Sequence, residues 1–332
     1  MTANSAPLLD VRNLETRFRT RDGFVHAVNS VSFSVAPGEL VGVVGESGSG
    51  KSVTMMSLMG LLPKSALVDA DSISLAGTEL TTLGAAAMRK VRGRDVGFVF
   101  QDPMTSLNPV FTVGYQISEG LRTHRGLSKA QARDRAAEML SLVGIPDAEQ
   151  RLDDFPHQFS GGMRQRVMIA MALATDPKLL IADEPTTALD VTIQAQILEI
   201  VKDLRERLSM GIVWITHDLG VVAGIADRVI VMYGGQIVEE APVKELFANP
   251  RHPYTVALLE TLPSLTGERA ERLRTIEGQP PILMAPPAQC PFAARCRNVM
   301  DRCRQSNPAR IDVGAGHSVA CFLAHDQEAA HA

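Results

Sequence analysis

Two features that would place this chain across a membrane are missing from its sequence. No apolar run approaches the roughly 20 residues that a membrane-spanning helix needs. The longest candidate, at positions 167–182, is interrupted by Asp176, Pro177 and Lys178. Residues 1–7 also lack the charged-then-apolar pattern of a signal peptide. We therefore expect the chain to remain in the cytosol and to reach any membrane through a partner.

An excess of positive charge is also missing. With 33 Lys and Arg against 37 Asp and Glu, the formal net charge is −4, whereas nucleic-acid-binding domains carry clustered positive charge. Hydrophobic residues make up 45% of the chain and charged residues 21%, which is ordinary for a globular protein. At 332 residues the chain can form one large domain or two smaller ones.

Cysteine is scarce and confined to one end of the chain. The four cysteines are Cys290, Cys296, Cys303 and Cys321, spaced C-x5-C-x6-C-x17-C. In the cytosol such a cluster is more typical of a metal site than of disulfides. Neither close pair has the tight spacing of zinc knuckles, and the pattern matches no common ferredoxin. Four thiolates on an irregular segment suit an iron–sulfur cluster, while spacing alone leaves zinc and unligated thiols open.

A glycine-rich motif at positions 45–52 predicts a phosphate-binding loop. It reads G-E-S-G-S-G-K-S, with an apolar strand expected at 40–44 and a helix beginning at Ser52, the context that a phosphate loop requires and a chance turn lacks. Glycines let the backbone wrap around a phosphate, and the helix N-terminus adds partial positive charge. Lys51 would reach the β- and γ-phosphates, and Ser52 would hold Mg²⁺. The residues expected to bind nucleotide are Gly45, Glu46, Ser47, Gly48, Ser49, Gly50, Lys51, Ser52 and Val53.

Two acids end a second apolar strand. The run at 179–183 closes with Asp183 and is followed by Glu184, the arrangement of a Walker B strand. Asp183 would contact Mg²⁺, directly or through water. Glu184 would orient and polarise the attacking water. The alternative is a solvated acidic pair at a strand end, which the phosphate loop upstream disfavours.

Two more polar residues follow apolar strands. Gln101 comes after the strand expected at 96–100, and His217 after the strand at 212–216. Residues that contact ligands lie at the carboxyl ends of strands in α/β sheets. The Gln101 amide can bind Mg²⁺ and order a water, and His217 is positioned to sense a γ-phosphate. Taken alone, either residue would more often be structural.

A serine followed by two glycines opens another expected helix. The pattern covers Ser160, Gly161, Gly162 and Met163. It would present a second anion-binding helix N-terminus, although as an isolated pattern it is weak. The helix belongs to a mostly helical insert at about 103–176, in which Ser128 begins a capping box. Asp190 precedes a further long helix.

The amino-acid composition changes in the last part of the chain. Six of the 19 prolines lie between 263 and 291, which indicates an extended connection. Before it, two strands turning at Gly234 and Gly235 predict a terminal hairpin. The predicted segments are a domain at 1–262, a proline-rich linker at 263–289, a cysteine segment at 290–322 and a frayed tail at 323–332.

The order of these motifs is more specific than any one of them. The order resembles the nucleotide-binding subunit of an ATP-binding-cassette (ABC) transporter over residues 8–262. The resemblance implies an α/β P-loop NTPase fold with a helical insert, plus a small C-terminal cysteine-containing extension.

The resemblance also identifies residues of this chain with the named motifs of the family. The counterparts of the A-loop, Q-loop, signature, D-loop and H-loop are Phe18, Gln101, Ser160-Gly161-Gly162, Asp190 and His217. Phe18 alone could be plain core, and the resemblance favours stacking on adenine. The signature reads F-S-G-G-M rather than L-S-G-G-Q, and it keeps the serine and glycines that meet phosphate.

Four further segments make the resemblance to a subgroup of ABC transporters more specific. Those at 101–109, 234–239, 249–255 and 290–296 are similar to the D-type ATPase subunit of dipeptide and oligopeptide importers. The subgroup implies ATP hydrolysis that powers import of di- or oligopeptides, with nickel chelates or another small solute as the alternative. A soluble ABC ATPase not linked to transport is the rival class. Such proteins show tandem cassettes, coiled-coil inserts or basic surfaces, whereas this chain has one cassette and a negative charge.

The resemblance also implies cofactors and partners. It implies ATP, Mg²⁺ at Ser52, Gln101 and Asp183, and a 4Fe–4S cluster at the four cysteines. ATP would lie at a head-to-tail interface with a paralogous second ATPase subunit, so that Ser160 to Met163 would touch the partner's ATP. Two integral membrane permeases and an extracytoplasmic substrate-binding protein complete the expected assembly. The chain would then lie on the cytoplasmic face of the inner membrane, without nucleic acid.

Overall fold

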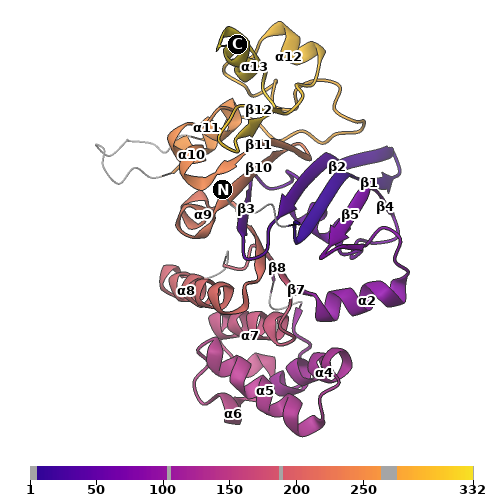
Figure 1. The fold of residues 1–332 in the computed structure, drawn as a ribbon, viewed down its shortest axis with the longest axis vertical. Coiled ribbons are helices and arrows are strands. Elements are labelled where there is room, and N and C mark those ends of the chain that lie inside the picture. Colours follow the sequence, from indigo (N-terminus) through magenta and orange to yellow (C-terminus); the bar gives the residue numbers. More distant parts are fainter. Residues whose placement is uncertain (1–5, 103–105, 187–189, 263–274, 332) are drawn as a thin grey trace. The chain divides into compact units, whose positions relative to one another are not determined.

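The computed structural model describes residues 6–102, 106–186, 190–262 and 275–331 (Figure 1). The chain divides into two compact units. The helical unit consists of Met1–Leu9, Val35–Leu40 and Leu75–Ile215, and the sheet unit of Asp10–Ser34, Val41–Ser74 and Thr216–Ala332. Within the described ranges, every helix is too short or too polar to cross a membrane.

Three buried strands form the centre of the helical unit. They are β7 (Val96–Val99), β8 (Leu179–Asp183) and β9 (Gly211–Ile215), which pair in parallel in that order. Every residue of β8 and β9 is buried. Parallel strands covered on both faces read as unbroken apolar runs, and this is why the sequence predicted them closely.

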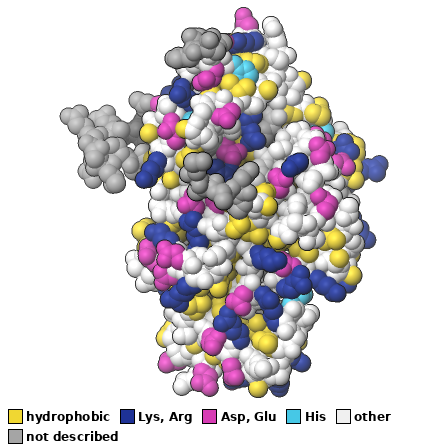
Figure 2. Space-filling model, viewed as in Figure 1, with side chains coloured by type: hydrophobic (Ala, Val, Ile, Leu, Met, Phe, Trp, Pro, Cys, Tyr) yellow, Lys and Arg dark blue, Asp and Glu magenta, His cyan; other side chains and the backbone are white. Residues whose placement is uncertain are grey.

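Helices make up most of the rest of this unit. They are α2 (Ala85–Arg94), α4 (Val113–Arg125), α5 (Lys129–Leu142), α6 (Ala148–Arg151), the short 3₁₀ helix η1 (Pro156–Gln158), α7 (Gly161–Leu173) and α8 (Val191–Leu208), besides the short strand β6 (Thr78–Glu79). Helices α4, α5 and α7 pack on one another, as the predicted insert requires, and residues 103–105 at its start lie outside the described residues. The predicted capping box of α5, between Ser128 and Gln131, is confirmed. On the face drawn in Figure 2, side chains of both charges are interspersed over these helices.

The sheet unit contains two groups of strands. The first has the order β2-β1-β5, with β4 antiparallel to β1; the strands are β1 (Leu9–Thr20), β2 (Gly23–Val35), β4 (Ala66–Asp69) and β5 (Ser72–Leu75). In the second, β3 (Leu40–Val44) pairs in parallel with β10 (Arg228–Tyr233), and β11 (Gln236–Pro242) pairs antiparallel with β10. The predicted hairpin at Gly234 and Gly235 is confirmed.

The C-terminal segment extends this second group of strands. Strand β13 (Ser318–Val319) pairs antiparallel with β11, and β12 (Ile311–Asp312) pairs with β13. The helices of the unit are α1 (Lys51–Leu58), α9 (Leu219–Ile225), α10 (Val243–Ala248), α11 (Pro253–Glu260), α12 (Asp301–Gln305) and α13 (Phe322–His331). The frayed tail expected at 323–332 is wrong for the described part, because α13 begins with apolar residues and buries Ala324 against Val319 and Cys321.

Part of the expected linker makes contacts with the sheet unit. Residues 263–274 lie outside the described residues. From residue 275 onward the chain has no regular element up to Cys290, and the carbonyl of Leu283 accepts the N–H of His26 on β2 at 2.8 Å. The described linker residues therefore run along the sheet unit as an irregular strap.

Candidate functional site

The phosphate loop lies in the sheet unit between β3 and α1, as predicted. Its backbone requires glycine at two places. Gly45 has a φ of 151°, and a Cβ there would lie 2.3 Å from the carbonyl oxygen of Met232. Gly50 has a φ of 101°, and a Cβ there would lie 2.6 Å from the carbonyl oxygen of Ala27. Another residue at either place would be strained and would clash, so these glycines fix the path of the loop.

The Lys51 ammonium is held by the loop that precedes it. Its Nζ donates to the carbonyl oxygens of Gly45 at 2.7 Å and of Glu46 at 2.9 Å, and Lys51 is only 5% exposed. The N–H of Gly235, in the β10–β11 turn, donates to the Ser49 carbonyl at 3.0 Å. The loop is therefore organised around Lys51 and anchored to the neighbouring hairpin.

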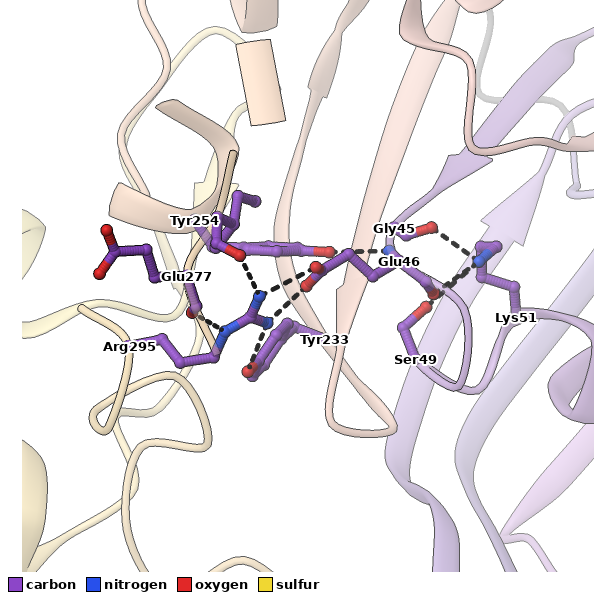
Figure 3. A network of polar contacts seen from close by, with 9 residues as sticks. Gly45, Glu46, Ser49, Lys51, Tyr233, Tyr254, Glu277 and Arg295 are labelled. Atoms are coloured by element: carbon purple, nitrogen blue, oxygen red, sulfur yellow. Dashed lines mark hydrogen bonds and ion pairs between the residues drawn. The ribbon is translucent and has the colours of Figure 1, made fainter. Parts of the chain in front are cut away.

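Glu46, the first variable position of the motif, is held by its side chain and by its backbone (Figure 3). Arg295 donates to both carboxylate oxygens, from Nη1 at 2.6 Å and from Nη2 at 2.9 Å. The Tyr254 hydroxyl accepts the Glu46 N–H at 2.8 Å. The Arg295 side chain is 5% exposed and that of Glu46 25%. Such a bidentate, charge-assisted pair is stronger and more directional than a neutral hydrogen bond.

Arg295 uses its other donors to join further parts of the chain. Its Nε donates to the carbonyl of Glu277 at 2.8 Å, Nη2 to that of Ile276 at 3.1 Å, and Nη1 to the Tyr233 hydroxyl at 3.2 Å. Hydrogen bonding to Glu46 raises the pKa of Arg295, so the guanidinium stays charged. One side chain thus connects the phosphate loop, β10 and the linker.

Aromatic rings pack against one another beside this hydrogen-bond network. The ring centroids of Tyr233, Tyr254 and Phe292 lie 4.6 to 5.3 Å apart. His252 caps α11, and its Nδ1 accepts the N–H of Tyr254 at 3.0 Å; burial lowers the pKa of His252 to about 4. The buried Glu239 carboxylate accepts the N–H of His252 at 3.0 Å. These contacts hold the start of α11, and with it the Tyr254 hydroxyl, against the loop.

Two further predicted nucleotide-binding residues lie in the sheet unit. His217 is exposed and follows Thr216, whose N–H donates to the Val43 carbonyl of β3 at 3.2 Å. It therefore lies beside the strand that leads into the phosphate loop. Phe18 is half-buried on β1, opposite Ala66 of β4. Contacts of His217 and Phe18 with nucleotide stay predictions.

In the helical unit, the structure brings two of the predicted catalytic residues together. Gln101 Nε2 donates to Glu184 Oε2 at 3.3 Å, because both follow the carboxyl ends of the paired strands β7 and β8. Asp183 is the last residue of β8 and is 6% exposed. Glu184 has a φ of 46°, and its N–H donates to the Ile215 carbonyl at 3.0 Å. A non-glycine residue held at positive φ costs free energy and is typical of functional sites.

The serine–glycine pattern lies at the N-terminus of α7, as predicted. The Ser160 Oγ accepts the N–H of Met163 at 3.3 Å, so Ser160 is the N-cap of the helix. Gly161 is exposed, with open space where its Cβ would be, whereas a Cβ at Gly162 would lie 3.1 Å from Ile193 of α8. A backbone without side chains at a helix N-terminus can be approached closely by an anion.

Asp190 occupies the same position on the next helix. Its carboxylate accepts the N–H of Ile193 at 2.9 Å and caps α8. Residues 187–189, which precede it, lie outside the described residues. Asp190 therefore has a structural role as a cap, and its predicted place at a subunit interface stays a prediction.

The four cysteine side chains line one small cavity in the sheet unit. The Cys290 N–H donates to the Cys303 carbonyl at 3.0 Å. Burial raises the pKa of Cys290 to about 11 and also raises that of Cys296 and of Cys321. Among the described residues, no group of three or more His, Cys, Asp or Glu is arranged to hold a metal ion. The expected iron–sulfur cluster is therefore not confirmed by the arrangement.

Sequence reasoning found the strand-end residues but missed the residues that hold Glu46. Both residues lie in segments that the sequence had singled out as typical of peptide importers, at 249–255 and 290–296. The first supplies Tyr254 and the second supplies Arg295, one contact each to Glu46. Their roles could not be inferred because neither segment lies near the loop in the sequence.

Comparison with known proteins identifies the relatives of this chain. A family model described as ABC transporter matches residues 28–187, and one described as oligopeptide/dipeptide transporter, C-terminal region, matches residues 238–303. The chain is 52% identical over 326 residues to the dipeptide transport ATP-binding protein DppD of Bacillus subtilis, covering 98% of this chain and 97% of that protein. It is 52% identical over 319 residues to the oligopeptide transport ATP-binding protein OppD of Bacillus subtilis, covering 96% of this chain and 89% of that protein.

A solved structure adds the fold. A dimeric ATP-binding cassette in a post-hydrolysis state, bound to ADP and Pi, is similar to the chain with a TM-score of 0.65 and 29% identity. The match covers 71% of this chain and 98% of that chain. The phosphate loop and the pairing of Gln101 with Glu184 are consistent with these relatives. The family models and the relatives together show that the chain belongs to the family of ATP-binding proteins of oligopeptide/dipeptide ABC transporters.

Proposed function

We propose that this chain hydrolyses ATP to power the import of di- or oligopeptides through an ABC transporter. The observation that carries the proposal is the hydrogen bond between Gln101 and Glu184. It joins an amide and a carboxylate at the ends of neighbouring parallel strands, where ligands bind in α/β folds. The peptide part is supported by the relatives, which are a dipeptide and an oligopeptide transport ATP-binding protein.

The chain's residues suit the chemistry of ATP hydrolysis. Lys51 supplies positive charge to the β- and γ-phosphates. The Ser52 hydroxyl, the Gln101 amide and the Asp183 carboxylate are hard oxygen ligands of the kind that Mg²⁺ prefers. When bound, Mg²⁺ neutralises phosphate charge. Glu184 orients and polarises the attacking water, and the Gln101 amide fixes the carboxylate in one orientation.

The complete ATP site includes a paralogous second ATPase subunit, arranged head to tail. Ser160, Gly161, Gly162 and Met163 contact the ATP of that partner, and the exposed Gly161 with open space beside it supports such an approach. Asp190 lies at the same interface. His217 senses the γ-phosphate, and Phe18 stacks on the adenine.

The transporter also includes components outside this chain. Two integral membrane permeases hold the chain at the cytoplasmic face of the membrane, and the loop after Gln101 contacts them. An extracytoplasmic substrate-binding protein delivers the peptide. The absence of a membrane-spanning helix among the described residues leaves attachment to these permeases as the route to the membrane.

An iron–sulfur cluster at the four cysteines is a further part of the proposal. The four thiols line one cavity, and Cys290, Cys296, Cys303 and Cys321 would together supply the thiolates that hold such a cluster. The raised pKa values of Cys290, Cys296 and Cys321 mean that metal must displace protons from these thiols on binding. A bound cluster would cross-link the parts of the C-terminal segment that meet at this cavity.

Reconstitution tests the transport role. The full chain is co-expressed with its partner ATPase and permeases, placed in proteoliposomes, and supplied with the cognate substrate-binding protein. We expect a dipeptide or oligopeptide to stimulate ATP hydrolysis and to be taken up, and Glu184→Gln in this chain to abolish both responses. Stimulation by a nickel chelate alone would contradict the peptide assignment. Failure to co-purify with any integral membrane protein would contradict the transport role itself.

A further inference from the structure

A single side chain connects the cysteine segment to the phosphate loop. Arg295 lies between Cys290 and Cys296 in the sequence and binds both carboxylate oxygens of Glu46, at 2.6 and 2.9 Å (Figure 3). Glu46 belongs to the loop that carries Lys51. The two ends of this contact are 249 residues apart in the chain, so the fold joins the segment that carries the cysteines to the nucleotide loop through the Arg295 side chain.

We propose that Arg295 is a positioning residue for the phosphate loop, through which the state of the four cysteines sets the affinity for nucleotide. The inference rests on the ATP-binding role of this loop. It does not depend on which group, if any, the cysteines bind.

The electrostatic reason lies in the charge of Glu46. A loop that must receive a triphosphate carries a carboxylate at its first variable position, and an unpaired carboxylate there would repel phosphate. Arg295 neutralises that charge and also fixes its direction, because a guanidinium binds a carboxylate with two parallel hydrogen bonds. The Tyr254 hydroxyl holds the N–H of the same residue at 2.8 Å. Together they fix both the charge and the backbone of Glu46.

The structural link to the cysteines is short. The Ala293 N–H donates to the Cys290 carbonyl and the Arg295 N–H donates to the Phe292 carbonyl, both at 3.0 Å. Phe292 is 2% exposed and packs against Tyr254. Cys290 and Arg295 thus lie on one compact turn that is packed firmly in place. A change that displaces the cysteines would therefore displace the guanidinium as well.

The first experiment is a titration of the full-length chain with a fluorescent ATP analogue. We expect Arg295→Met to weaken binding by about tenfold, the factor that corresponds to losing one charge-assisted hydrogen bond. The matched control is Arg297→Met, which removes an exposed arginine of the same segment, paired with Glu260 at 3.3 Å. The control should bind like the wild type. Equal affinity of the two variants, at a temperature where circular dichroism shows both folded, would overturn the proposal.

A double-mutant cycle separates positioning from simple stabilisation. If the unpaired carboxylate causes the loss, Glu46→Gln combined with Arg295→Met should bind nucleotide more tightly than Arg295→Met alone. A merely structural role predicts instead a lower melting temperature with unchanged affinity, or a double variant weaker than either single one. Either of those results would overturn the proposal.

The cysteine arm uses the same assay. Cys296→Ser should weaken nucleotide binding in the wild-type background and should have no further effect when Arg295→Met and Glu46→Gln are present. Equal losses in both backgrounds would remove the link between the cysteines and the loop. The wild-type titration is the reference: a wild-type chain that binds no nucleotide would refute the proposed ATPase function, whereas normal wild-type binding with an unaffected Arg295→Met variant would refute this inference alone.

Discussion

The Gln101 amide nitrogen donates to the Glu184 carboxylate at 3.3 Å, although the two residues are 83 positions apart. The contact exists because β7 and β8 are parallel neighbours and both residues follow the carboxyl ends of their strands. It fixes the orientation of the carboxylate that is proposed to polarise water. The arrangement makes the roles of individual residues in this part of the site testable.

Replacement of the proposed base is the most direct test. Glu184→Gln keeps the shape of the side chain, so ATP binding should be retained, while hydrolysis should fall by at least ~10²-fold, the scale of losing a positioned catalytic group. The matched control is Glu199→Gln, on the exposed face of α8, where the side chain is 72% exposed and contacts Lys202. Steady-state ATPase assays of the assembled transporter measure both. Near-normal hydrolysis by Glu184→Gln would exclude Glu184 as the base.

Ser160 combines a structural and a proposed phosphate-binding role, and one substitution separates them. Aspartate caps helices about as well as serine, so Ser160→Asp should retain the thermal stability of the chain. Its negative charge would oppose the partner's phosphate, so ATP hydrolysis by the assembled transporter should fall by at least ~10²-fold.

Ser128 provides the control for this substitution. Its Oγ accepts the N–H of Gln131 at 3.3 Å, the same distance as for Ser160 and Met163. Ser128→Asp should change neither stability nor hydrolysis. Full activity of Ser160→Asp would argue against contact between this helix N-terminus and phosphate.

Stability should depend on pH through His252. Burial lowers the pKa of His252 to about 4 despite the attraction of the Glu239 carboxylate, whereas an unfolded histidine titrates near about 6.5. Between these values the unfolded chain binds more protons than the folded one, so the free energy of unfolding falls as the pH falls. The loss should reach about 3 kcal/mol. Protonation also removes the Nδ1 acceptor for the Tyr254 N–H.

His252→Asn isolates this contribution. Asparagine can still cap α11 and does not titrate, while the two chains share every other titrating group. Thermal or urea unfolding of both chains at several pH values between about 4.5 and 7 should give a flatter dependence for the variant. Identical slopes would show that His252 is not buried as a neutral ring.

The cysteine proposal predicts the composition of the purified chain. After anaerobic purification the full-length protein should be brown and contain iron and acid-labile sulfide, because four thiolates on one segment suit an iron–sulfur cluster. Cys321→Ser should lose most of the iron, since it removes one of the thiols that line the cavity. A colourless wild-type protein with stoichiometric zinc would contradict the cluster.

Sequence periodicity predicted the strands that end at the candidate site more accurately than it predicted the C-terminal segment. Strand β8, with its two acids, lies where the apolar run indicates, because a strand buried on both faces excludes polar residues. The prediction of a frayed tail was wrong because no pattern in the sequence around residues 322–331 predicts helix α13. That helix depends on burial of Ala324 against Val319 and Cys321, which is a tertiary contact.

By itself, the sequence determined the phosphate loop, the ends of the strands and the caps of the helices. Each depends on residues close together in the chain: glycines at positive φ, apolar runs, and serine or aspartate before a helix. Only the tertiary structure decided that Arg295 and Tyr254 hold Glu46, and that Gln101 meets Glu184. Those contacts join residues brought together by strand pairing and by packing of the C-terminal segment on the sheet, and no local pattern records which distant side chain a carboxylate will bind.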